Sequence, residues 1–146
     1  MTLTKDDVHH FIRQNKLAIL STVDEQGFPH AAPIYYVTDE VLNFYFMTAT
    51  QTAKHTNLLN QSRVSITIVN ENENETLQIK GEASECPAKI TDVLQMLAEK
   101  LNQGDAFPDT IPFMSFKKNE KMAIQIVPSE IKMRRYEGSH REEISL

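Results

Sequence analysis

The chain has 146 residues, of which 40% are hydrophobic and 24% charged, and these proportions suit one globular domain over residues 1–146. The net charge of −5 argues against nucleic acid as a general partner, and no apolar run reaches the about 20 residues that cross a bilayer. Cys86 is the single cysteine, which excludes an internal disulfide. The N-terminal residues lack the apolar core of a signal peptide, and the two observations together predict a cytoplasmic protein.

The N-terminal segment predicts an amphipathic helix over residues 4–15. Thr4 can cap the first turn, and Val8, Phe11 and Ile12 recur at helical spacing, so they form one apolar stripe. This stripe should pack on whatever follows.

Apolar segments with β-branched residues then predict an antiparallel sheet. Short polar turns join the first three segments, and strands connected in this way are usually antiparallel neighbours. Gly104 should end the helix that is expected over 88–102, and a Pro-containing loop should follow over 105–112. Pro128 leaves open whether the final apolar segments are one bent strand or two. The expected strands are 17–23, 29–37, 42–48, 62–69, 76–84, 121–127 and 130–136, and two further helices are expected over 52–60 and 88–102.

Six or seven consecutive strands, several of them apolar on both faces, indicate a small closed barrel with outer helices. A doubly wound parallel sheet would need a regular alternation of strands and helices, which is absent. Pro33 cannot donate to a strand ladder, so its strand should be an edge, contain a bulge or face a ligand.

The segment over residues 47–63 has features of an anion site. It contains four threonines and Lys54, and it runs from a strand end into a short helix. Threonine hydroxyls donate hydrogen bonds, lysine suits phosphate, and a helix N-terminus exposes unpaired N–H groups. The same residues also fit a structural role, because threonines cap helices and a lone lysine is usually solvated.

No catalytic motif is present. The sequence lacks a GxSxG, an HExxH, a GxGxxG after the first strand and a P-loop. His9 and His10 are adjacent on a helix and point in different directions, so no metal site is predicted. His30, His55 and His140 are isolated and are expected at the surface. Catalytic residues therefore stay unknown.

The order of LAILSTVDEQGFPHAAPIYYV, LNFYFMT and TAKHTNLLNQSRVSITI resembles the pyridoxamine 5′-phosphate oxidase-like family of FMN-binding split β-barrels. The resemblance spans about residues 17–84, with weaker support from KMAIQIVPSEIKMRRY. It implies a mainly β fold, a six-stranded antiparallel Greek-key split barrel with flanking helices. It also implies a homodimer with FMN at the interface, and an FMN-dependent oxidoreductase.

The resemblance also implies the residues that hold FMN. Its phosphate would contact a threonine at the third strand's end and the residues that open the next helix, and its ring would lie along the second strand. Ala53 departs from the second basic residue of many relatives, so the phosphate site would be less positive, and Arg63 is a candidate for additional charge. The implied cofactor-binding residues are Ala32, Pro33, Ile34, Tyr35, Met47, Thr48, Thr52, Ala53 and Lys54.

Other features limit what the resemblance implies. Thr76 stands where oxidase members carry a glutamine, and their C-terminal arginine–histidine pair is not evident, so pyridoxamine phosphate oxidation is not inferred. Tyr35, Tyr36 and His30 are the polar side chains nearest to the implied ring position, and none is a strong acid–base candidate.

A non-catalytic cofactor-binding protein is the alternative. Related split barrels hold haem, and others act as flavin carriers or sensors or take a deazaflavin. A haem would need an axial histidine, for which His140 is the candidate. The expected partners are a second copy of the chain and a small-molecule substrate or electron donor whose identity the residues do not give, with no nucleic acid and no membrane.

Overall fold

The computed structural model describes residues 2–102 and 120–146. The predicted helix end at Gly104 and the predicted loop over 105–112 lie outside these residues. The described elements, in chain order, are α1 (Lys5–Gln14), β1 (Leu17–Val23), β2 (Pro29–Tyr35), β3 (Val37–Thr38), β4 (Phe44–Ala49), α2 (Ala53–Asn60), β5 (Arg63–Asn70), β6 (Glu75–Glu85), a 3-10 turn (Pro87–Lys89), α3 (Ile90–Asn102), β7 (Lys121–Glu137) and β8 (His140–Ser145).

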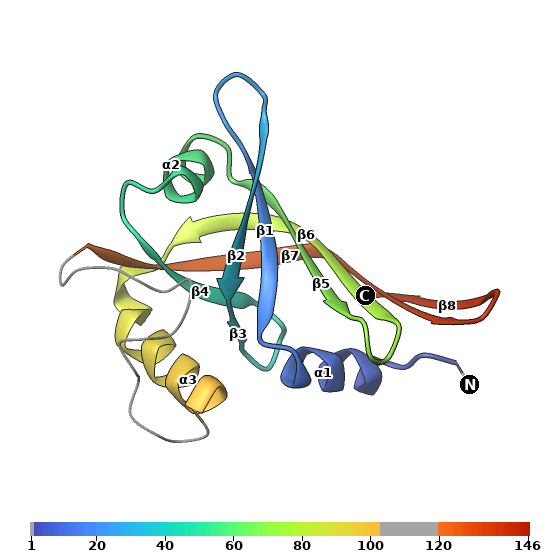
Figure 1. The fold of residues 1–146 in the computed structure, drawn as a ribbon. Helices are drawn as coiled ribbons and strands as arrows, with labels where there is room; N and C mark the ends of the chain where they lie inside the picture. Colours follow the sequence, from blue (N-terminus) through green and yellow to red (C-terminus); the bar gives the residue numbers. More distant parts are fainter. Residues whose placement is uncertain (1, 103–119) are drawn as a thin grey trace.

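All described strands form one antiparallel sheet with the order β2-β1-β5-β6-β7-β4-β3, and β8 is added to β7 (Figure 1). The sheet curves into a split β-barrel with flanking helices, which confirms the predicted fold class. The described residues contain eight strands, whereas six or seven were predicted, depending on whether Pro128 divides the last one. The additional ones are the two-residue β3 and the C-terminal β8.

The last two predicted strands are a single strand, β7, that continues through Pro128. A register shift follows Lys80 in β6, so Gly81 lies opposite Pro128 and Lys80 lies opposite Glu130. Ser129 therefore has no partner in β6 and forms a β-bulge. The bulge lets the sheet accommodate Pro128, which has no N–H to donate. Because β7 is one long strand, it pairs with β4, β6 and β8.

The barrel interior is the main hydrophobic core. The predicted stripe of α1 is buried in it, with Val8, Phe11 and Ile12 at most 2% exposed. Thr4 caps α1 in a capping box with Asp7, as the sequence predicts. α1 therefore covers the barrel from below in the view of Figure 1.

α3 packs on the outer face of the sheet. Val93 and Leu97 contact the outward side chains of β4 and β7, among them Tyr45, Met47 and Ala123. The apolar face of α3 is therefore buried against the sheet. This second, smaller core fixes β4 from outside.

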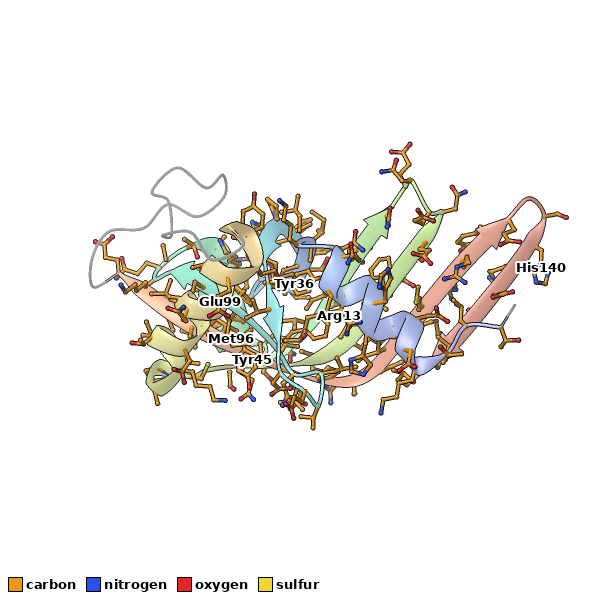
Figure 2. The ribbon with its side chains drawn as sticks, turned by 90° about the horizontal axis from the view of Figure 1, so that it is seen from below. Arg13, Tyr36, Tyr45, Met96, Glu99 and His140 are labelled. Carbon is orange, nitrogen blue, oxygen red and sulfur yellow. The ribbon has the colours of Figure 1, made fainter. Side chains whose placement is uncertain are left out.

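Tyr36 connects α1 to α3 (Figure 2). Its hydroxyl donates to the carbonyl oxygens of Ile12 and Asn15 at the end of α1. The Lys100 ammonium, from α3, also donates to Ile12 O at 3.0 Å and lies 3.8 Å from the centre of the Tyr36 ring. Burial lowers the pKa of Lys100 to about 7.

Candidate functional site: an open barrel edge beside a helix N-terminus

The barrel is split between β2 and β4. β2 pairs with β1 alone and β4 pairs with β7, so the prediction that the second and third strands are antiparallel neighbours is wrong. The two-residue β3, and not β2, pairs with β4, and it does so only at Phe44 and Tyr45. The facing edges of β2 and of residues 46–49 in β4 therefore have no partner strand within the described residues, although the two strands are in contact. Pro33 lies on this edge, which confirms one of its predicted positions. Such an edge offers main-chain donors and acceptors to a ligand.

The predicted ring-binding residues alternate between the two faces of β2. Ile34 is 3% exposed and belongs to the barrel core, so its main chain alone is left for a ligand. Ala32 lies on the same face, whereas Pro33 and Tyr35 pair with the exposed Ile19 and Leu17 and lie on the outer face. Met47 is buried in the second core beneath α3, so its side chain contacts that helix.

The structure brings Thr48 and Thr52 together at the end of β4, with their hydroxyl oxygens 3.2 Å apart. Thr52 is the N-cap of α2: its Oγ1 accepts from His55 N at 3.4 Å and donates to Ala49 O at 3.0 Å. We call Thr48, Thr52, Ala53 and Lys54 the cradle. These are four of the nine predicted cofactor-binding residues, and they surround one helix N-terminus.

The cradle contains one lysine, Lys54, that has no ion-pair partner among the described residues. Lys54 is half-buried, burial lowers its pKa, and no hydrogen bond or ion pair holds its ammonium within the described chain. The first turn of α2 contains no acidic residue, whereas α1 has Asp6 and Asp7 in its first turn. An anion bound here would meet the helix dipole and the lysine together.

His55 contradicts the surface position predicted for it. Its side chain is buried, with Nδ1 3.1 Å from Gln51 N and Nε2 3.1 Å from Glu85 Oε2. Sequence reasoning missed this residue because its partner Glu85 is 30 positions away, at the end of β6. No pattern of neighbouring residues in the sequence predicts such a contact.

His30, His140 and Tyr36 lie in three different environments. His30 Nδ1 is buried without a hydrogen-bond partner in the described structure. His140 is at the tip of the β7–β8 hairpin, where its side chain is 70% exposed and 3.9 Å from Glu142 (Figure 2). Tyr36 is fully buried, and its hydroxyl is used by α1. The described residues contain no cluster of three metal-ligating side chains.

The outer face of the sheet has a hollow of about 780 Å³, which we call the outer hollow. Its volume suits a small-molecule site, but none of the nine predicted cofactor-binding residues lines it. Arg63 lines the outer hollow, whereas Lys54 does not, so the structure gives no support for Arg63 as an additional charge in the cradle. We place the candidate site at the cradle because of its chemistry, not its volume.

A strip of apolar side chains crosses the same outer face. Leu17 and Ile19 on β1 are 41% and 40% exposed, and Tyr35 and Pro33 are their partners on β2. Val69 on β5 is 63% exposed. We call these five residues the outer strip.

The antiparallel sheet and its open edge between β2 and β4 define the class of fold, the split β-barrels. The profile of the family described as "Pyridoxamine 5'-phosphate oxidase" matches residues 4–132. The chain belongs to this family. None of the curated protein sequences matches it, and no helix within the described residues is long and apolar enough to cross a membrane.

Solved structures with the same fold belong to proteins described by different cofactors. An FMN-binding, pyridoxamine 5′-phosphate oxidase-related protein from Nostoc punctiforme is 15% identical, with a TM-score of 0.68, over 100% of this chain and 97% of its own. A FAD-binding protein from Mesorhizobium loti is 14% identical, with a TM-score of 0.70, over 94% and 98%. The haem storage protein HutZ from Vibrio cholerae is 21% identical, with a TM-score of 0.69, over 88% and 92%. At these sequence identities the likeness shows a shared fold and nothing about the cofactor of this chain.

Proposed function

We propose that this protein is an FMN-binding flavoprotein and an oxidoreductase whose substrate is a small molecule. The observation that carries the proposal is the half-buried ammonium of Lys54, which has no partner among the described residues and lies at a helix N-terminus that lacks acidic residues. A phosphate would restore the missing counter-charge, and it would raise the pKa of Lys54 that burial lowers.

The cradle residues have distinct roles in this proposal. The main-chain N–H groups of Ala53 and Lys54 and the Lys54 ammonium bind the phosphate, while the hydroxyls of Thr48 and Thr52 complete the cradle. The open edge of β2, from Ala32 to Tyr35, offers its main chain to the polar rim of the flavin ring. FMN supplies hydride transfer when bound, and the protein binds and orients it.

The outer strip supports a homodimer with the cofactor near its interface. Monomeric proteins rarely leave a contiguous apolar patch open to water, and the outer strip adjoins the β2 edge that would meet the ring. A second copy would cover both the strip and the flavin.

An absorption spectrum of the purified protein tests the proposal. Copurified FMN, or binding of added FMN at micromolar concentration, is the expected result. If neither is observed, the FMN proposal is wrong. A Soret band would instead support the haem alternative that the likeness to HutZ brings with it.

Turnover requires a separate test. If the protein is an oxidoreductase, the bound flavin should bleach under anaerobic conditions with a suitable reductant and recover with an acceptor, over many cycles. A flavin that is bound but never reduced by any physiological donor would indicate a carrier or sensor.

A further inference from the structure

His55 is buried among polar contacts that fix its tautomer. A main-chain N–H can only donate, so Nδ1 accepts from Gln51 and carries no proton. Nε2 then carries the proton and donates to the Glu85 carboxylate. Both ring nitrogens are therefore engaged in opposite roles, and neither is left to bind a ligand.

Gln51 is in an uncommon backbone conformation. Its φ is +68°, in the left-handed region that costs a non-glycine residue about 1 kcal/mol or more. The residue lies in the turn of residues 49–52, between β4 and α2, which sets how Thr48 and Thr52 approach each other. Without support, the backbone of Gln51 would relax toward negative φ.

Several hydrogen bonds hold the turn, and three of them join it to Glu120, close it on itself or reach Gln51. Thr50 N donates to Glu120 O at 2.7 Å, Thr52 Oγ1 donates to Ala49 O at 3.0 Å, and His55 Nδ1 accepts from Gln51 N. Of these contacts, the one made by His55 reaches the residue with positive φ. Glu85 is paired with Ile124 of β7 in the sheet, so the His55–Glu85 contact ties this turn to the sheet.

We propose that His55 is a positioning residue that holds the turn of residues 49–52, and with it the cradle, in the geometry that binds phosphate. This inference rests on the proposed function. His55 acts through Gln51, because its two nitrogens are used by the turn and by β6. Loss of the contact between His55 and Gln51 should therefore weaken the binding of the FMN phosphate and leave the binding of the flavin ring unchanged.

Two substitutions separate the two nitrogens. His55→Asn keeps an acceptor near the position of Nδ1 and loses the contact with Glu85, whereas His55→Gln keeps a donor near Nε2 and loses the acceptor for Gln51. His55→Gln should weaken FMN binding by about 3- to 10-fold, the equivalent of one neutral hydrogen bond, and His55→Asn should weaken it less. Riboflavin lacks the phosphate, so its affinity should not change in either variant.

A second change tests the role of Gln51. Glycine adopts positive φ without strain, so adding Gln51→Gly to His55→Gln should restore most of the FMN affinity. His140→Gln is the matched control, because this side chain is exposed at a hairpin tip, and it should bind FMN like the wild type.

Fluorescence titrations with FMN and with riboflavin measure these effects, and hydrogen exchange of the Gln51 amide measures the contact itself. The exchange should be slow in the wild type and in His55→Asn and fast in His55→Gln, also in protein without cofactor. An unchanged ratio of FMN to riboflavin affinity in His55→Gln, or unchanged Gln51 exchange, would overturn this inference alone. A wild type that binds no FMN overturns the proposed function, and the exchange data then still show whether His55 holds the turn.

Discussion

At the scale of single residues, the cradle depends on one charge. Among the described residues, Lys54 is a half-buried lysine without a partner in the first turn of a helix. The sequence predicted its place but not its burial, and its burial is what makes an anionic ligand the natural partner.

Lys54→Ala should weaken FMN binding by about 1–3 kcal/mol, because it removes a charge-assisted contact with the phosphate. Fluorescence titration measures the change, with riboflavin as the ligand that should be unaffected. Lys80→Ala is the control, since Lys80 lines the outer hollow. If Lys80→Ala weakened FMN binding and Lys54→Ala did not, the phosphate would lie in the outer hollow.

Gly81 is required by close packing. A Cβ at this position would lie 2.7 Å from Val127 O and 2.8 Å from a methyl group of Ile126. Gly81→Ala should therefore destabilise the fold by about 1–3 kcal/mol, because backbone atoms of the bulge cannot move aside cheaply. Urea unfolding measures it, and Ser84→Ala, at an exposed position on the same strand, should leave the midpoint unchanged.

At the scale of elements, the sequence predicted the bounds of a helix or strand well where local signals such as caps and apolar stripes are strong. α1 was predicted over 4–15 and spans Lys5–Gln14, because its cap and its stripe are both local. β8 was missed because HREEIS alternates charged residues with little apolar content. Its stability comes from pairing with β7, including the ion pair of Arg134 with Glu143 at 2.7 Å, which becomes visible only when the register is known.

The junction of α1 and α3 should make stability depend on pH through Lys100. The pKa of this group is about 7 in the folded protein and higher when unfolded, so the unfolded state binds more protons between these values. Its contribution to stability therefore rises as pH increases from 7 to about 10.

Lys100→Met removes this titration and keeps a side chain of similar length. The difference in unfolding free energy between wild type and Lys100→Met should shift in favour of the wild type as pH increases from 7 to 10. Urea unfolding at both pH values checks it. A difference independent of pH would show that the ring of Tyr36 and Ile12 O keep the ammonium charged.

At the scale of the whole molecule, the proposed dimer makes the outer strip testable. Ile19→Lys places a charge in the middle of the strip and should shift the proposed dimer toward monomer, because a buried unpaired charge is costly. Light scattering at micromolar concentration measures the mass. Val41→Lys, at an exposed apolar residue outside the strip, is the control and should leave the mass unchanged. A wild-type monomer would contradict the dimer itself.

The sequence by itself determined the approximate positions of most strands, the amphipathic helices and the threonine–lysine segment at the start of α2, and it limited Pro33 to an edge, a bulge or a ligand-facing strand. These features depend on residues close together in the chain, where periodicity, caps and proline act directly. The tertiary structure decided that Met47 faces α3, that β7 is one strand, and that His55 reaches Glu85. Each of these depends on contacts between distant segments, and only closure of the sheet brings such segments together.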